Sequence, residues 1–135
     1  MSILSIAVSG LSAASLRVSV AASNIANARA TGPLPASGGS GTPAYVPLRV
    51  DQVTQSSGSM PGGTVATVST VSPSYAAQSD PSAPFANEDG LVAAPNVDLA
   101  SEFVQMAAAK YSFIANAKVI QAYAETEQTL LDIKT

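Results

Sequence analysis

The sequence predicts a mainly α-helical fold in which two long helices, one near each end of the chain, form an antiparallel, coiled-coil-like hairpin. A Pro/Gly-rich middle containing a small β-ribbon is expected between them. Two observations carry this prediction. Apolar residues recur with heptad spacing near both termini, and all nine prolines and eight of the nine glycines lie between Ala30 and Pro95. Heptad spacing favours helices that pack together, whereas proline and glycine interrupt regular structure.

Three segments follow from this pattern. Residues 1–29 form an N-terminal core helix, residues 30–95 an irregular insert with the ribbon and a connector, and residues 96–135 a C-terminal core helix. The first helix is expected from about Ile3 to Ala28, because Gly32 and Pro33 end it. Its heptad stripe consists of Leu4, Ala7, Leu11, Ala14, Val18, Ala21, Ile25 and Ala28. A second stripe consists of Ser5, Ser12, Ser15 and Ser19.

Two short strands are predicted in the middle segment. Val46–Asp51 alternates apolar and polar residues, and Thr64–Val71 is rich in β-branched residues. Ser37–Gly41 is typical of a flexible loop, and Gln55–Ser59 of a turn or loop between the strands. The remainder, Asp80–Pro95, is predicted to be an extended connector with a turn over residues 87–90.

The second helix is expected from about Asp98 to Lys134. Asn96 or Asp98 can cap its first turn, since either side-chain oxygen accepts an unpaired backbone N–H. Lys110 and Glu127 interrupt its stripe. That stripe consists of Leu99, Phe103, Met106, Phe113, Ala117, Ile120, Ala124 and Leu131.

Composition argues against chemistry. The chain has no cysteine and no histidine, which removes thiolate sites, the commonest general base and every His-containing triad. Its net charge is −3 and its basic residues are scattered, so a nucleic-acid surface is not expected. Asp89, Asp98 and Glu102 are better explained as cap and dipole residues than as a catalytic or metal cluster. We therefore expect neither an enzyme nor a cofactor.

The N-terminal segment invites two other interpretations, which we do not favour. Ile3–Ala14 is apolar enough for a signal-peptide core, but no basic residue precedes it. As a membrane span the helix contains many serines and ends in Asn24 and Asn27, so a stable span is not expected. Charged residues make up 11% of the chain, against about a quarter in an average soluble domain. A surface so poor in charge is suited to being covered by partners.

Each helical stripe has a structural and a functional interpretation. The heptad stripes can form an intramolecular hairpin or an inter-subunit bundle, and we favour both, with intermolecular contacts dominating. The serine stripe can be a solvated face or a surface for close helix approach. Asn24 and Asn27 can terminate the helix. Alternatively they hydrogen-bond across subunits, with Asn116 as a candidate partner, and fix the register.

Several motifs resemble one family. Ser9–Ala13 followed by Ala22–Asn27 resembles the N-terminal signature of bacterial flagellar axial proteins, the rod and hook group. The Gly32-Pro33 insertion with a later tyrosine, Tyr45, is similar to the proximal rod members of the basal-body rod family. Further matching segments lead into and along the C-terminal helix: Asp80-Pro81, Asn87–Val92, Pro95–Asp98, Glu102, Met106 and Phe113–Asn116.

The resemblance implies a structural subunit of the flagellar basal-body rod, which crosses the periplasm and transmits torque. It implies export through the flagellar type III apparatus without a cleaved signal peptide. The implied partners are copies of the chain, other rod and axial proteins, the export-gate adaptor and the MS-ring region. The candidate assembly interface combines both helices: Leu4, Ala7, Leu11, Ala14, Val18, Ala21, Asn24, Ile25, Asn27, Phe103, Met106, Phe113, Asn116, Ala117, Ile120, Ala124 and Leu131.

An alternative from another class is a small secreted or membrane-anchored binding module that uses the ribbon over residues 46–71. A mature N-terminus beginning after Ala14 or Ala22 would favour it.

Overall fold

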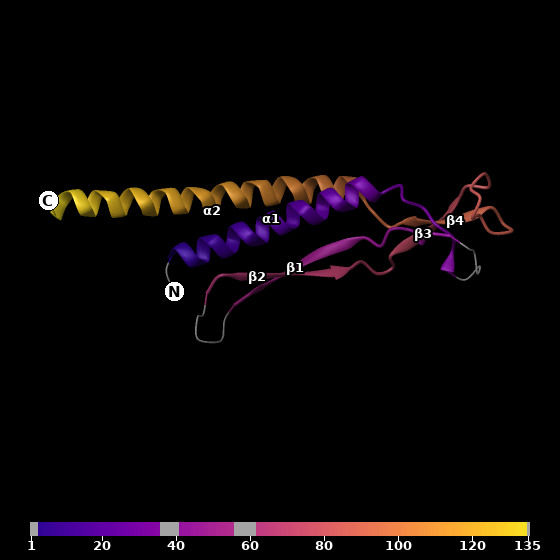
Figure 1. Ribbon diagram of the computed structural model, residues 1–135, viewed down its shortest axis with the longest axis horizontal. Coiled ribbons are helices and arrows are strands. Elements are labelled where there is room, and N and C mark those ends of the chain that lie inside the picture. The colour runs from indigo at the N-terminus through magenta and orange to yellow at the C-terminus, as the bar shows by residue number, and fades with distance from the viewer. Residues whose placement is uncertain (1–2, 36–40, 56–61, 135) are drawn as a thin grey trace. The chain divides into compact units, whose positions relative to one another are not determined.

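A computed structural model describes residues 3–35, 41–55 and 62–134 of the chain. Two long helices lie at the ends of the sequence and short strands lie between them, which confirms the predicted two-helix fold with a β-containing middle (Figure 1). The elements in chain order are α1 (Ile3–Asn27), β1 (Leu48–Thr54), β2 (Thr64–Thr70), β3 (Tyr75–Ser79), β4 (Leu91–Pro95) and α2 (Leu99–Lys134).

The chain forms two compact units, and each draws on segments that are distant in sequence. The first consists of Met1–Ser19, Val50–Thr67 and Val104–Thr135, and the second of Val20–Arg49 and Val68–Phe103. Both units therefore contain parts of the two helices and of the middle segment. Neither unit can form until the N-terminal and C-terminal parts of the chain have met.

Helix α1 has the predicted extent to within one residue and buries a face made of small side chains. Its buried apolar residues are Ala7, Ala13, Ala14, Val20 and Ala21. Alanine has the highest helix propensity and leaves little bulk between helices, so it permits close approach of neighbouring backbones. Three of these residues, Ala7, Ala14 and Ala21, belong to the predicted heptad stripe.

Helix α2 begins where the sequence predicted, and the structure decides between the two candidate caps. Asp98 Oδ1 accepts hydrogen bonds from the backbone N–H groups of Ala100 at 3.0 Å and Ser101 at 3.4 Å. Asp98 Oδ2 accepts a third from the Ser101 hydroxyl at 2.9 Å. Asn96 instead donates its side-chain N–H to the Pro73 carbonyl at 3.0 Å. Asp98 is thus the N-cap, and it satisfies two otherwise unpaired donors of the first turn.

Strands β1 and β2 form the predicted ribbon. They pair as a two-stranded sheet. Gln55 N–H bonds to the Gly63 carbonyl at one end, and Val71 N–H to the Pro47 carbonyl at the other, which is the order of an antiparallel pair. Residues 36–40 and 56–61, which hold most of the predicted loop and turn, lie outside the described residues.

The predicted connector over residues 80–95 is wrong in part, because its last five residues form strand β4. This strand pairs antiparallel with β3, from Tyr75 opposite Pro95 to Ser79 opposite Leu91. The predicted turn before it is confirmed, since Gly90 N–H bonds to the Asn87 carbonyl at 2.9 Å. The two strand sequences, YAAQS and LVAAP, contain little of the β-branched alternation that predicts strands. Pairing, rather than local propensity, makes them strands.

Candidate assembly interface

In the first unit, α1 and α2 are in close contact at Gly10. An added Cβ at Gly10 would lie 2.6 Å from Asn116 Oδ1, closer than side chains tolerate. Asn116 is itself held in place, because its Nδ2 donates to the Ser112 carbonyl at 2.8 Å. Glycine at this position therefore allows the helices to meet with an amide side chain between them.

The ribbon also contacts α1 in the same unit. Ser9 Oγ donates to the Ile6 carbonyl at 2.7 Å and accepts the Thr64 backbone N–H at 3.1 Å. Gly63 has a positive φ of 86°, and a Cβ there would lie 2.7 Å from Ser9 Oγ. Position 63 therefore needs glycine on two grounds, conformation and space. These contacts fix the start of β2 on α1.

Arg17, the single charged residue of α1, is half-buried in this unit. Its guanidinium donates to Gln105 Oε1 of α2. It also lines a polar cleft together with Ser9, Gln52, Asn116 and other uncharged residues of α1, α2 and the ribbon. The bond to Gln105 joins the two helices through a charge-assisted contact.

In the second unit, Asn24 is the centre of a hydrogen-bonded cluster that we call the Asn24 node, consisting of Asn24, Tyr45, Leu48 and Glu102. Asn24 is fully buried. Its Nδ2 donates to the Leu48 carbonyl and to Glu102 Oε1, each at 2.7 Å. Its Oδ1 accepts the Leu48 backbone N–H and the Tyr45 hydroxyl, each at 3.0 Å. Both donors and both acceptor sites of the amide are therefore used.

The Asn24 node connects α1, the segment that enters β1, and the first turn of α2. A buried amide that makes all four hydrogen bonds can be replaced by no other side chain without leaving a polar group unpaired. Asn24 thus has an intramolecular role that the sequence analysis missed. Glu102, interpreted there as a cap or dipole residue, is its acidic partner. Asn27 forms a bond within its own helix, from Nδ2 to the Ser23 carbonyl at 2.9 Å.

The contact stripes of the two helices differ from the predicted ones only in part, because Ala7, Ala14 and Ala21 of the predicted stripe are buried. Gly10 and Asn24 of α1 each precede a predicted seam residue, Leu11 and Ile25, by one position. On α2, Glu102 makes the contact whereas Phe103, its neighbour in the predicted stripe, is 59% exposed. The helices meet through small and polar residues, and the larger apolar ones are displaced toward the surface.

The predicted interface residues therefore divide by burial. Asn24 and three alanines, at positions 7, 14 and 21, are buried within the chain, so they are not open to a neighbour in this conformation. Partly buried members are Leu4, Leu11, Val18, Ile25, Asn27, Met106, Asn116, Ala117 and Ile120. Exposed members are Phe103, Phe113, Ala124 and Leu131.

Large apolar side chains on both helices face outward in the first unit. On α2, Val104 is 66%, Tyr111 71% and Ile133 76% exposed. The other large exposed apolar residues of the helical parts of this unit are Ile3, Ile6, Val8, Phe113, Ile114, Val119, Leu130 and Leu131. Exposed apolar area of this extent is typical of surfaces that bind another protein or a membrane.

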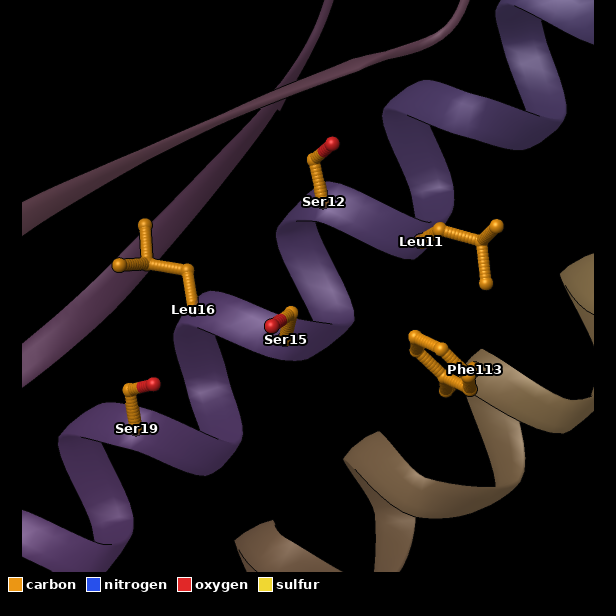
Figure 2. A pocket seen from close by; sticks show the side chains of 6 residues that line it. All are labelled: Leu11, Ser12, Ser15, Leu16, Ser19 and Phe113. Carbon is orange, nitrogen blue, oxygen red and sulfur yellow. The ribbon is translucent and has the colours of Figure 1, made fainter.

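The serine stripe lies beside one of these apolar patches. Ser12, Ser15 and Ser19 are exposed and line a shallow groove of the first unit together with Leu11, Leu16 and Phe113. Figure 2 shows Leu11 of α1 and Phe113 of α2 pointing toward one another across the space between the helices. The groove carries no charged residue, and within the chain the serine face is solvated.

The pKa values of two groups are shifted, one at the N-cap of α2 and one within the helix. The hydrogen bonds from the Ser101 side chain, the Ser101 backbone and the Ala100 backbone lower the pKa of Asp98, which agrees with its role as N-cap. A hydrogen bond to Glu127 and its negative charge raise the pKa of Tyr123. Among residues 3–35, 41–55 and 62–134, no group of three or more acidic residues could hold a metal ion.

Helix α1 is long and apolar enough to cross a membrane by length and composition alone. A core helix of a soluble protein passes the same criterion, so a single such helix is weak support for a span. The buried Asn24, bonded to Tyr45 and Glu102, gives α1 a protein environment at its C-terminal end.

Comparison with known proteins shows that the regions of both helices match flagellar rod families. Residues 4–33 match the family described as flagella basal body rod protein, and residues 88–133 match the C-terminal region of the flagellar basal body rod FlgEFG proteins. The flagellar basal-body rod protein FlgC of Salmonella typhimurium is 38% identical over 124 residues, covering 89% of this chain and 87% of the relative. The FlgC proteins of Salmonella typhi and Escherichia coli O6:H1 give the same identity and coverage.

Proposed function

The chain belongs to the flagellar basal-body rod protein family and is a structural subunit of the rod, and we propose that it assembles through the exposed faces of its helices and transmits torque between its neighbours. The observation that carries this proposal is the exposed apolar surface of α1 and α2 in a chain with few charges. The binding-module alternative depends on the ribbon alone, whereas both helices match the rod family.

The end of α2 supports assembly most directly. In the first unit, Gly10 lies opposite Asn116, and the helices run antiparallel, so the last turns of α2 continue beyond the first residue of α1 (Figure 1). There Leu130, Leu131 and Ile133 are all more than half exposed. Each such side chain gains about 1.5–3 kcal/mol when fully buried, so covering the three is a substantial driving force for association.

Torque transmission follows from the same surface. A packed helical interface resists twist because its side chains interdigitate and cannot slide without losing contacts. We infer that copies of this chain and other rod proteins supply the covering helices, in a coiled-coil-like arrangement. Contacts with the export-gate adaptor and the MS-ring region are predictions from family membership, and chemical cross-linking in isolated basal bodies tests them.

We also propose that α1 is retained after export rather than cleaved as a leader. This proposal is supported by the contacts of α1, which supplies Ser9 and Gly10 to the first unit and Asn24 to the second. Removing α1 would therefore remove these contacts from both units. Mass spectrometry of the subunit extracted from basal bodies tests this. An N-terminus at or beyond Ser15 would contradict it.

The assembly test replaces Leu130, Leu131 and Ile133 together by glutamine in a cell that lacks its own copy of the gene. Because these side chains are exposed, the purified variant should unfold at the same urea concentration as the parent. It should nevertheless fail to enter the rod, with loss of swimming in soft agar. The matched control replaces exposed polar residues on the same part of α2, with Gln121→Ser and Glu125→Gln, and should assemble. Normal rods in the triple variant would refute assembly through this face.

A deletion of residues 2–14 tests the family function itself. It removes the Gly10 contact and the first half of α1, so rod assembly and motility should both be lost. Motile cells with complete basal bodies would show that the chain is not a required rod subunit.

A further inference from the structure

The sheet formed by β3 and β4 has one open edge, in the second unit. Backbone bonds flank its ladder, from Asp80 N–H to the Gly90 carbonyl at 2.9 Å and from Asn96 N–H to the Ser74 carbonyl at 3.0 Å. In an antiparallel pair, the backbone groups of alternate residues face the partner. Residues 74, 76, 78 and 80 therefore face β4, and the N–H and C=O groups of Tyr75, Ala77 and Ser79 face away from it.

The opposite edge of the sheet is already occupied. Gly32 forms an antiparallel bridge with Ala93 of β4, with one hydrogen bond of 3.0 Å and a second of 2.8 Å. For Tyr75, Ala77 and Ser79 of β3, the described part of the chain contains no partner for the outward backbone groups. Among the described residues, β3 is therefore the open edge of this sheet.

Strand β3 lacks two of the features that protect natural sheet edges, charged residues and proline. Proteins discourage strand addition with charged residues, proline, bulges or a covering segment. All five residues of β3 are exposed, and none is charged or a proline. The outward N–H and C=O groups alternate along the strand, so an extended polypeptide can form hydrogen bonds with all of them. A helix cannot, because its own backbone groups are already paired.

We propose that β3 receives an extended, uncharged segment of an adjacent rod subunit as an additional antiparallel or parallel strand. This inference rests on the proposed rod function, because that function supplies the neighbour. A symmetric pairing of β3 with β3 of a second copy is the competing arrangement. Such a twofold contact closes on itself after two subunits, whereas a continuing assembly needs contacts between different surfaces.

The test is a proline that removes one outward donor without touching the β4 ladder. Ala77→Pro takes away the Ala77 N–H, which has no partner among the described residues, so the purified variant should keep the far-ultraviolet spectrum and nearly the unfolding midpoint of the parent. Ala77→Ser is the matched control, because it retains the N–H. In cells lacking their own copy, the proline variant should enter rods at least roughly fivefold less than the serine variant, since a lost hydrogen bond with its steric consequence is worth about 1–3 kcal/mol.

A second variant keeps the test decisive if the proline disturbs folding. Ala77→Asp retains the backbone donor but places a charge on the edge, and it should also reduce rod entry. Equal rod entry of a folded Ala77→Pro or Ala77→Asp variant and of Ala77→Ser would overturn the inference, while the rod function would stand because the parent still assembles. If purified parent dimerises in light scattering and Ala77→Pro stays monomeric, symmetric pairing replaces our proposal.

Discussion

The Asn24 node gives the sharpest prediction, through the isosteric change Asn24→Asp. The substitution replaces the Nδ2 donor by an oxygen that lies 2.7 Å from two other acceptors, the Leu48 carbonyl and Glu102 Oε1. Two buried acceptors then lose their donor, one of them a carboxylate. Leaving such groups unpaired costs about 1–3 kcal/mol each, so the free energy of unfolding should fall by about 3–5 kcal/mol at pH 8. Much of the stability of a small domain would be lost.

This loss should depend on pH with a definite sign. Burial and the nearby Glu102 carboxylate raise the pKa of the new carboxyl at position 24 above its value in the unfolded chain. The protonated carboxyl can donate to Glu102, so its stabilising contribution is present below the unfolded pKa and is lost as pH rises through the folded one. The variant should therefore be closer to the parent in stability at pH 5 than at pH 8.

Urea unfolding followed by circular dichroism measures these effects, with two further variants as controls. Asn27→Asp makes the same change at a half-buried residue with one local bond and should cost at most about 1 kcal/mol. Adding Glu102→Gln to Asn24→Asp restores a donor opposite the new carboxylate, so the pair should be more stable than the sum of single effects by about 1–2 kcal/mol. If Asn24→Asp lowers the free energy of unfolding by less than about 1 kcal/mol, or if its effect and that of Glu102→Gln simply add, the hydrogen bonds of the Asn24 node do not have the proposed role.

Three further predictions concern the helices. Asp98→Ala should lower the thermal midpoint at pH 7. Because the folded pKa of Asp98 is depressed, the advantage of the parent should shrink as pH falls through that value, whereas a constant difference would contradict capping by the carboxylate. Gly10→Ala should destabilise the free chain by about 1–2 kcal/mol, because the clash with Asn116 outweighs the gain in helix propensity. Adding Asn116→Ala should restore the lost stability. If the double variant is as unstable as Gly10→Ala alone, the close contact is contradicted. Amide exchange over residues 124–134 should be fast in the monomer and slow in isolated rods, and equal rates would contradict burial of this segment on assembly.

Much of the fold followed from local signals. Heptad spacing and the distribution of proline and glycine located α1 and α2 to within one residue, because helix formation depends mainly on neighbouring residues and their caps. Alternation of apolar and polar residues located β1, and β-branched residues located β2. Strands β3 and β4 escaped prediction because alanine-rich segments have no strong preference, and only their mutual pairing and the bridge to Gly32 make them strands.

The candidate interface, too, was predicted in part from the sequence and decided in part by the tertiary structure. The sequence by itself determined that the chain has two long helices, of which the first carries a single charged residue, that it contains no histidine or cysteine, and that it has motifs of the rod family. The heptad stripe placed Ala7, Ala14 and Ala21 on the inner face of α1, but the other contacts of the two helices were decided by the tertiary structure. A heptad count ranks Leu11 and Phe103 above Gly10 and Glu102, but close packing favours small residues, and the buried amide of Asn24 requires a partner that only folding brings near. The large apolar residues are thereby left outside, where the rod can cover them.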